Sequence, residues 1–259
     1  GAVPVGESNP GALPEVIDIT GLHTRNSAAQ VGTFACSDPL FNKIHTLIDW
    51  AVRSNMASVL TDCPHREKLG WLEVTHLMGG SIQYRYDISR LYAKQVNDMR
   101  TAQHANGMVP TIAPQYVTFS PDFIDTPEWG SAFVIIPWNL YEWYGDLAPL
   151  RDNYERMKRY VDYLGSRADN HIVAYGLGDW YDIGPDRPGY AQLTSNGVTA
   201  TAIYYQDVKI LERVARLLGK EADVRKYAAL ASDIKRAFNE KFFDKKTLKY
   251  DRDSQTANS

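Results

Sequence analysis

The sequence predicts an all-α fold, an α/α toroid in which long helices pair and their connections gather at one end. Apolar residues recur at helical spacing through most of the chain from residue 37 onward. Two connections, residues 104–128 and 170–194, are much longer than helix–helix connections usually are, and aromatic residues and Asp are frequent in them. A helical bundle or a helical repeat would have shorter connections, and no repeat period is present.

The first 36 residues differ from the rest of the chain. Residues 15–20 alternate between polar and apolar in the manner of a strand, and residues 30–36 form a second candidate strand. We therefore expect residues 1–36 to be a linker or the tail of a preceding β domain. Residues 37–259 then form the helical part of the chain.

The first helix is expected to begin at Asp38-Pro39, because Asp caps a first turn and Pro fits the first helical position. A second helix follows Asp87. Residues 129–144 form an apolar helix that ends at Gly145, and residues 147–164 form the next one. Each of these stretches places its apolar residues on one helical face.

The C-terminal part continues the pattern. Helices are expected over residues 196–218, ending at Gly219, and over residues 221–242. Residues 243–250 resemble a short hairpin, and residues 254–259 resemble the first turn of another helix. A toroid of six hairpins needs about twelve helices and the pattern predicts at most eight, so we expect the chain to be roughly the N-terminal half to two thirds of an (α/α)6 domain.

The composition excludes several classes of function. A net charge of −3, with 44% hydrophobic and 23% charged residues, gives no reason to expect nucleic acid or an anionic membrane as a partner. No apolar run has the roughly 18 residues that a membrane span needs. Two cysteines, Cys36 and Cys63, make neither a disulfide framework nor a zinc site. The 12% aromatic share suits helix packing and also stacking on sugars.

The densest group of reactive side chains is residues 61–73, TDCPHREKLGWLE. It contains three carboxylates together with Arg, Lys, His and Trp. Pro64 and Gly70 predict irregular backbone, which would place these side chains at the end of a barrel, where a substrate reaches them. The structural alternative is a capping loop in which Asp62 and Arg66 form an ion pair.

This stretch resembles the signature of glycoside hydrolase family 78, the bacterial α-L-rhamnosidases, in which an Asp-Cys-Pro segment precedes Arg, Glu and a Gly-Trp pair. Further pieces stand in the expected order. They are Trp129-Gly130, the helix ending in PWNLYEWYGD at residues 137–146, Gly178-Asp179-Trp180 and Gln255-Thr256-Ala257. The resemblance covers roughly residues 30–259. It implies an (α/α)6 catalytic domain that removes terminal α-L-rhamnosyl residues with inversion of configuration.

The resemblance also implies roles for single residues. Glu67 matches the general acid, and the residues matching the rhamnose subsite are Asp62, Arg66, Trp71, Trp129 and Trp180. Glu73 stands near the position of a second acidic residue that follows the Gly-Trp pair in the motif. Many members have Gly-Asp after the Trp, whereas this chain has Leu72-Glu73 and its motif is one residue shorter. Many members also have Asp after Trp-Gly, where this chain has Ser131. We expect Asp179 to bind substrate.

General acid catalysis of glycoside cleavage needs a carboxyl that stays protonated near neutral pH, through apolar surroundings or neighbouring anions. Inversion also needs a second carboxylate as base. The resemblance puts that base on a later helix, so we expect it outside this chain and the chain alone to be inactive. Asp125, Glu128 and Asp179 are the in-chain candidates.

No metal or cofactor is expected, because His65 and His76 lack ligand spacing and are read as hydrogen-bonded structural residues. The expected partners are a rhamnose-containing oligosaccharide or glycoside and the remaining domains of the parent polypeptide. The residues leave the compartment open, and the resemblance favours the periplasm or secretion. The alternatives are a non-catalytic carbohydrate-binding module, another inverting α/α glycosidase, or a polysaccharide lyase using Arg66 and Tyr116.

Overall fold

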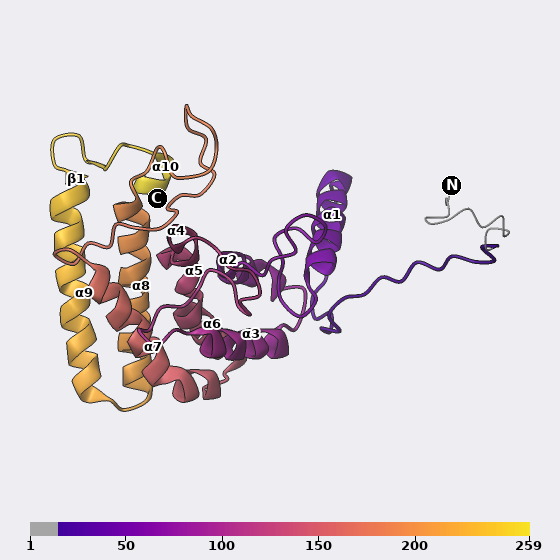
Figure 1. Cartoon of the computed structure of the whole chain (residues 1–259), viewed down its shortest axis with the longest axis horizontal. Coiled ribbons are helices and arrows are strands. Elements are labelled where there is room, and N and C mark those ends of the chain that lie inside the picture. The colour runs from indigo at the N-terminus through magenta and orange to yellow at the C-terminus, as the bar shows by residue number, and fades with distance from the viewer. Residues whose placement is uncertain (1–14) are drawn as a thin grey trace, which may run out of the picture.

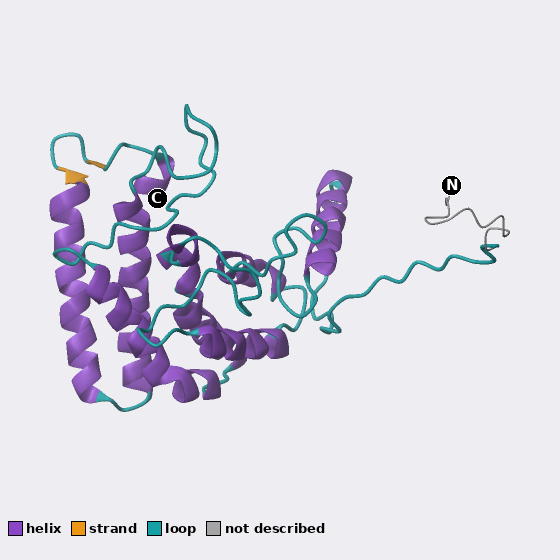
Figure 2. Cartoon of the chain, in the orientation of Figure 1, coloured by secondary structure: helices purple, strands orange, loops and turns teal. Residues whose placement is uncertain are grey.

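The computed structural model describes residues 15–259, and the first 14 residues of the predicted linker lie outside the described part. Within residues 15–259 the regular structure is helical apart from two strands of two residues each, and long loops connect these elements (Figure 2). The predicted all-α class is confirmed. The helices and strands run in the order α1 Pro39–Asn55, α2 Leu72–Ile82, α3 Ser89–Ala102, α4 Pro121–Ile124, α5 Pro127–Gly130, α6 Ala132–Tyr144, α7 Ala148–Arg167, α8 Asn196–Leu217, α9 Glu221–Phe242, β1 Phe243–Asp244, β2 Lys249–Tyr250 and α10 Gln255–Asn258.

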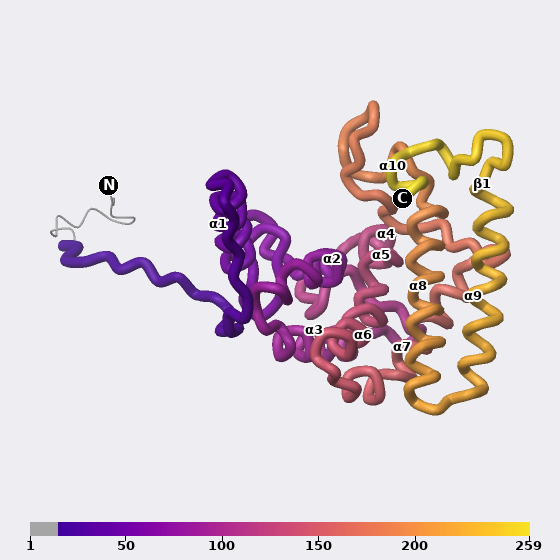
Figure 3. Tube along the Cα trace, turned by 180° about the vertical axis from the view of Figure 1, so that it is seen from behind, coloured from indigo at the N-terminus to yellow at the C-terminus, as the bar shows by residue number. Residues whose placement is uncertain are grey.

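From α6 to α9, each helix packs against the next one in the chain. The long helices α8 and α9 lie side by side at one end of the molecule, and α7 and α6 come next (Figure 1). Helix α6 is central, because it packs against α2, α3, α7 and α8. Helix α1 stands apart at the other end, beside the extended N-terminal segment, and the view from behind shows the same order (Figure 3). The connection before α8 and the connection around α4 meet near α2.

Large aromatic side chains fill much of the space between the helices. The largest fully buried ones are Tyr92, Tyr154, Tyr160, Tyr227 and Phe133. Burial of a ring of this size stabilises the fold by roughly 2–3 kcal/mol. Many of the aromatic residues therefore serve packing, while others remain at the ends of the helices.

Several helix ends follow from local chemistry. The Asp38 side chain accepts a hydrogen bond from the Leu40 amide at 2.8 Å, which confirms the predicted start of α1. Helix α6 ends at Gly145 with a left-handed φ of 70°. The predicted helix over residues 129–144 is divided into α5 and α6. Gly130 lies at this division, where a Cβ atom would come 2.5 Å from the Tyr160 hydroxyl.

The strands predicted before residue 37 are not formed. Residues 15–29 have no regular structure, and Gln30 makes a single β-bridge with Tyr86. Val16, Ile17 and Ile19 are largely exposed, so no neighbouring strand covers the alternating face within the described residues. Helix α4 lies within the long connection over residues 104–128, for which no helix was predicted. No helix within residues 15–259 is long and apolar enough to cross a membrane.

Candidate active site

The loop after α1 folds back on itself around Glu67. The Lys68 amide donates to the Cys63 carbonyl at 3.0 Å, and the Asp62 amide donates to the Leu69 carbonyl at 3.3 Å. Lys68 adopts a left-handed φ of 60°, an uncommon conformation for a residue with a side chain. The Tyr116 hydroxyl, from the connection before α4, donates to the Lys68 carbonyl at 2.5 Å. Two distant segments thus fix the backbone next to Glu67.

The Gly-Trp pair connects this loop to α2. Gly70 approaches Val59 so closely that a Cβ atom would lie 2.9 Å from a methyl group of Val59. Trp71 forms a β-bridge with Ile112, and the Leu72 amide donates to the Thr111 carbonyl at 2.9 Å. Helix α2 begins at Leu72, so Glu73 lies in its first turn. The loop and the helix therefore present Glu67 and Glu73 to the same side.

A cavity of about 390 Å³ lies at this side of the molecule. This volume is within the range of small-molecule sites. Its lining residues are Asp62, Glu67, Trp71, Glu73, Val74, Phe123, Trp129, Leu177, Trp180 and Tyr181. Six of the eight residues predicted from the sequence are among them, whereas Arg66 and Asp179 are not.

Aromatic rings form the walls of the cavity. The ring centroids of Trp71 and Phe123 are 5.8 Å apart, and those of Phe123 and Trp180 are 5.4 Å apart in an edge-to-face arrangement. Phe119, which is not among the lining residues, stacks on Trp71 with the ring centroids 5.2 Å apart. Trp129 is only 3% exposed and contributes from α5. Phe119, Phe123 and Tyr181 were missed in the sequence, where the aromatic content of the two long connections was the available signal.

Glu67 is held by its tryptophan neighbour. Its Oε2 accepts a hydrogen bond from Trp71 Nε1 at 2.6 Å, four residues along the chain. Burial raises the pKa of Asp62, and the nearby carboxyl of Glu67 raises it further. The ligand atoms of Asp62, Cys63 and Glu67 lie within 4.8 Å of one another. Such an exposed acidic group is not by itself a metal site, and two carboxylates with one thiol do not form the closed ligand set of a structural zinc site.

Two further carboxyls lie deeper. Burial raises the pKa of Glu73 to about 7, with additional contributions from the negative charges of Glu128, Asp179 and Asp62. Burial likewise raises the pKa of Glu128 to about 7. His76 Nε2 lies 2.8 Å from the Glu128 carbonyl oxygen, and burial lowers the pKa of this imidazole. The predicted hydrogen bonding of His76 is confirmed, whereas His65 is exposed and its side chain has no hydrogen-bond partner among the described residues.

The remaining predicted residues lie around the cavity. Arg66 is exposed, and none of the ion pairs in residues 15–259 includes it, so the alternative of a capping loop with an ion pair between Asp62 and Arg66 is not formed. The Asp62 carboxyl faces Glu67 instead. Asp179 Oδ2 accepts hydrogen bonds from Thr256 at 2.6 Å and Thr194 at 3.5 Å, which fix the connection before α8.

Asp125 occupies a different environment from the cavity carboxyls. It accepts a hydrogen bond from the Tyr163 hydroxyl and pairs with Arg167 at 3.3 Å. It borders a second cavity, of about 500 Å³, that shares no residue with the one around Glu67. Its partners make Asp125 a poor candidate for a catalytic base.

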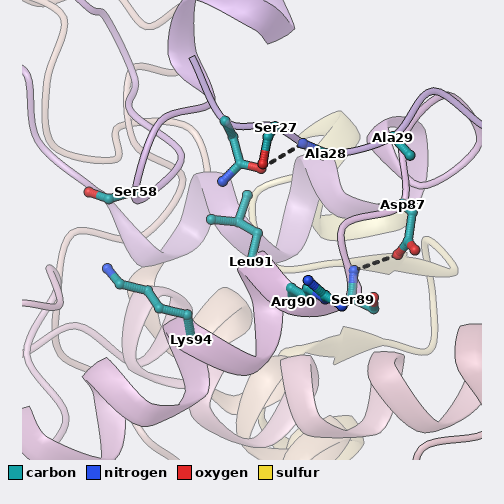
Figure 4. A pocket seen from close by; sticks show the side chains of 10 residues that line it. Ser27, Ala28, Ala29, Ser58, Asp87, Ser89, Arg90, Leu91 and Lys94 are labelled. Atoms are coloured by element: carbon teal, nitrogen blue, oxygen red, sulfur yellow. Dashed lines mark hydrogen bonds between the residues drawn. The ribbon is translucent and has the colours of Figure 1, made fainter. Parts of the chain in front are cut away.

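A further cavity, of about 430 Å³, lies between the N-terminal segment and the start of α3 (Figure 4). Short hydrogen bonds order its edges, from the Ser89 amide to Asp87 at 3.0 Å and from the Ala28 amide to Asn26 at 2.9 Å. It contains none of the residues predicted to act on a substrate. The cavity around Glu67, whose walls include the indole rings of Trp71, Trp129 and Trp180, is therefore the candidate active site, and we call it the indole-walled cavity.

Comparison with known proteins identifies the family of the chain. Residues 29–259 match the family described as bacterial alpha-L-rhamnosidase 6 hairpin glycosidase domain. An alpha-L-rhamnosidase of Formosa agariphila is 34% identical over 242 residues, which are 88% of this chain and 25% of that protein. An alpha-L-rhamnosidase of Streptomyces avermitilis is 31% identical over 227 residues, 87% of this chain and 21% of that protein.

Solved structures show the same relationship. The alpha-L-rhamnosidase from Dictyoglumus thermophilum superimposes with a TM-score of 0.79 and 39% identity, over 86% of this chain and 25% of that chain. The Streptomyces avermitilis alpha-L-rhamnosidase complexed with L-rhamnose has a TM-score of 0.79 and 30% identity, over 90% of this chain and 22% of that chain. The chain thus spans about a quarter of the length of these relatives. It belongs to the bacterial α-L-rhamnosidase six-hairpin glycosidase family.

Proposed function

We propose that the full-length protein hydrolyses terminal α-L-rhamnosyl residues from glycosides or polysaccharides, with Glu67 as the general acid. One observation carries the proposal. Glu67 lines an indole-walled cavity together with Asp62 and Glu73, and its carboxyl is oriented by the Trp71 N–H at 2.6 Å. A carboxyl in this position can protonate the departing glycosidic oxygen of a sugar that occupies the cavity.

The walls of the cavity suit a deoxy sugar. Rhamnose presents a methyl group and one apolar face, and the rings of Trp71, Trp129 and Trp180 offer apolar surface of matching kind. Asp62 and Glu73 offer hydrogen-bonding groups on the polar side of the cavity. Arg66 and Asp179, which stand outside the lining, are proposed to contact the sugar or its leaving group at the rim.

Inversion requires a base about 6.5–9.5 Å from the acid, with a water molecule between them. Of the in-chain candidates, Asp125 is bound by Tyr163 and Arg167, and Glu128 is 8% exposed. Asp179 is held by Thr256. These contacts support the expectation that the base is supplied from outside residues 1–259, which remains a prediction. Measurable turnover by residues 1–259 alone would contradict it.

The division of the chain at residue 36 is part of the same proposal. Residues 37–259 are proposed to belong to the catalytic domain, and residues 1–36 to a linker or the tail of a preceding domain. The lack of regular structure over residues 15–29 is compatible with a linker. Limited proteolysis of the full-length protein tests this, since a linker is cut before the helical domain is.

The decisive experiment compares the full-length protein with its Glu67→Gln variant on an aryl α-L-rhamnoside and on a natural rhamnose-containing disaccharide. Loss of the acid is expected to lower kcat on the disaccharide by about 10³-fold, because general acid catalysis contributes roughly 10²–10⁴-fold. The aryl substrate, whose leaving group needs less protonation, should lose less. Nuclear magnetic resonance of the first product identifies the anomer and so tests inversion.

The matched control is Glu142→Gln, an exposed glutamate of α6 outside the cavity. It should leave kcat unchanged. Equal activity of the Glu67→Gln and wild-type proteins on the disaccharide would remove Glu67 from the acid role. No cleavage of either substrate by the wild-type protein would reject the rhamnosidase function.

A further inference from the structure

The part of the indole-walled cavity that contains Trp180 is built on irregular backbone. Leu177, Trp180 and Tyr181 line the cavity, and all three lie in the connection before α8, where no helix or strand is formed. Tyr181 has a left-handed φ of 67°, an uncommon conformation for a residue with a side chain. Tyr181 and Tyr190, whose rings lie edge-to-face against Trp180, are both more than half exposed. Exposed rings hold a neighbour weakly, so other contacts must fix this wall.

The other contacts come from residues 251–256, which we call the C-terminal segment. Helix α10 lies beside the end of α8 that the connection reaches (Figure 1). Within residues 15–259, every hydrogen bond from residues 179–194 to another part of the chain ends in the C-terminal segment. These bonds run from Thr256 to Asp179 at 2.6 Å, between Ser254 and Thr194 at 2.6 Å, and from Arg252 to the Gln192 carbonyl at 2.8 Å.

Asp179 joins the C-terminal segment to the wall, because it directly precedes Trp180 in the chain. Its Oδ2 accepts hydrogen bonds from the hydroxyl of Thr256 at 2.6 Å and from that of Thr194 at 3.5 Å. Thr194 is only 1% exposed. Hydrogen bonds to a carboxylate are stronger than those between neutral groups. Two hydroxyls from separate segments therefore set the direction of the Asp179 side chain and limit the movement of the indole next to it.

The C-terminal segment is attached to α9 independently of the wall. The Asp251 amide donates to the Phe242 carbonyl at 2.8 Å, and the hydroxyl of Tyr250, directly before the segment, donates to Asn239 at 2.6 Å. The Asp251 carboxylate in turn accepts from the Ser195 amide at 2.8 Å and from its hydroxyl at 3.0 Å. A segment fixed to a long helix thus holds the connection at both of its ends.

We propose that Thr256 is a positioning residue: its hydrogen bond to Asp179 fixes Trp180 at the cavity, and it thereby sets the affinity for the sugar. The role rests on the proposed function, because it needs a sugar in the cavity. The proposed acid, Glu67, is oriented by Trp71, which lies in a different segment. Loss of the Thr256 hydroxyl should therefore weaken binding without slowing the chemical step to the same degree.

The first measurement needs no substrate. Hydrogen exchange of the full-length protein, followed by mass spectrometry, reports on residues 177–195, whose hydrogen-bonded amides include those of Tyr181, Ala191, Gln192, Leu193 and Ser195. Thr256→Val should speed exchange there about fivefold, the effect of one hydrogen bond. Thr256→Ser keeps the hydroxyl and should not. Unchanged exchange in Thr256→Val would overturn the positioning role.

The matched control is Thr101→Val. Thr101 is exposed on α3, and its hydroxyl donates to the Asn97 carbonyl of the same helix at 2.9 Å. The substitution removes a threonine hydroxyl that has no contact with the connection before α8. It should leave both the exchange of residues 177–195 and the affinity for sugar unchanged.

The second measurement is the affinity for L-rhamnose by calorimetry, together with kcat and KM on an aryl α-L-rhamnoside. Thr256→Val should raise Kd and KM about fivefold and leave kcat within about twofold of the wild-type value. Thr256→Ser should restore the wild-type constants. Asp251→Ala removes the attachment at Ser195, the end of the connection farther along the chain from Trp180, and should raise Kd by a smaller factor.

The outcomes separate this proposal from the proposed function. Faster exchange in Thr256→Val at an unchanged Kd would overturn the link between the C-terminal segment and sugar binding. A Kd raised equally in Thr256→Ser and Thr256→Val would overturn the role of the hydroxyl. Failure of the wild-type protein to bind L-rhamnose would count against the rhamnosidase function itself, and hydrogen exchange would still test whether Thr256 fixes the wall.

Discussion

Asp49 of α1 and the carboxyls around the cavity have opposite surroundings. The Asp49 carboxylate is held by Arg53 at 2.8 Å, by Arg85 at 3.1 Å and by the Tyr86 hydroxyl at 2.5 Å. Burial alone would raise the pKa of Asp49, but the hydrogen bonds from Arg85 and Tyr86 and the two positive charges lower it. This carboxylate is ionised, and it fastens α1 to the turn before α3.

The cavity has the reverse arrangement. Asp62, Glu67 and Glu73 line it and Glu128 lies close to Glu73, and no ion pair within residues 15–259 includes any of these four. The pKa of Glu73 and that of Glu128 are raised to about 7. Carboxyls that are buried away from cations lower stability when they ionise, and they are found where a reaction needs them protonated. The comparison separates acids that hold the fold from acids suited to chemistry.

The largest expected effect concerns the pH dependence of stability. Because the folded-state pKa of Glu128 lies above the unfolded value of 4.5, the folded protein binds more protons between pH 4.5 and 7, and stability falls as the pH rises through this window. Glu128→Gln should flatten this fall by up to about 3 kcal/mol. Chemical unfolding of the full-length protein at pH 5 and pH 8 measures it. A fall of equal size in both proteins would contradict the prediction.

Asp49→Asn should act in the opposite direction. The lowered pKa of Asp49 means that its stabilisation is complete above the unfolded value of 3.8 and is lost as the pH falls through the lower folded value. At pH 7 the variant should be less stable by roughly 1–3 kcal/mol, because it loses charged hydrogen bonds to two arginines. The difference from the wild-type protein should shrink below pH 4. The matched control is Asp233→Asn, whose carboxyl makes only an exposed contact with Arg236 and should change stability little.

The smallest expected effect sharpens the comparison inside the cavity. Trp71→Phe keeps an aromatic wall but removes the N–H that donates to Glu67. The variant should lower kcat on a rhamnoside about three- to tenfold, the effect of one hydrogen bond, with a smaller change in KM. Trp50→Phe, a half-exposed residue of α1 outside the cavity, is the control. A change confined to KM would show that the indole serves binding only.

Local signals in the sequence predicted much of the fold. The Asp38 cap, the ends at Gly145 and Gly219 and the helical spacing over residues 221–242 depend on neighbouring residues, which is why they could be read directly. The strands expected before residue 37 failed because alternation does not reveal whether a partner strand exists. Helix α4 is a single turn within a proline-containing connection, too short to show a period.

The candidate site was only partly predictable, for a similar reason. The motif around Glu67 is contiguous, and four of its residues, Asp62, Glu67, Trp71 and Glu73, line one cavity. Phe123 and Leu177 come from connections about 50 residues apart, and only the folded chain brings them together. The alternative ion pair of Arg66 with Asp62 is not formed among the described residues, because proximity in sequence does not fix which way two side chains of an irregular loop point.

The double role of Trp71 has a consequence for how this site can change over generations. Its ring is part of the cavity wall, and its N–H donates to the Glu67 carboxyl. Under the proposed function, a mutation there alters substrate preference and turnover in one step, which leaves few viable intermediate sequences. Phe123 and Tyr181 line the same cavity without a hydrogen bond to Glu67 in the described part of the chain. Substitutions there would change the shape of the cavity and leave the hydrogen bond between Trp71 and Glu67 in place.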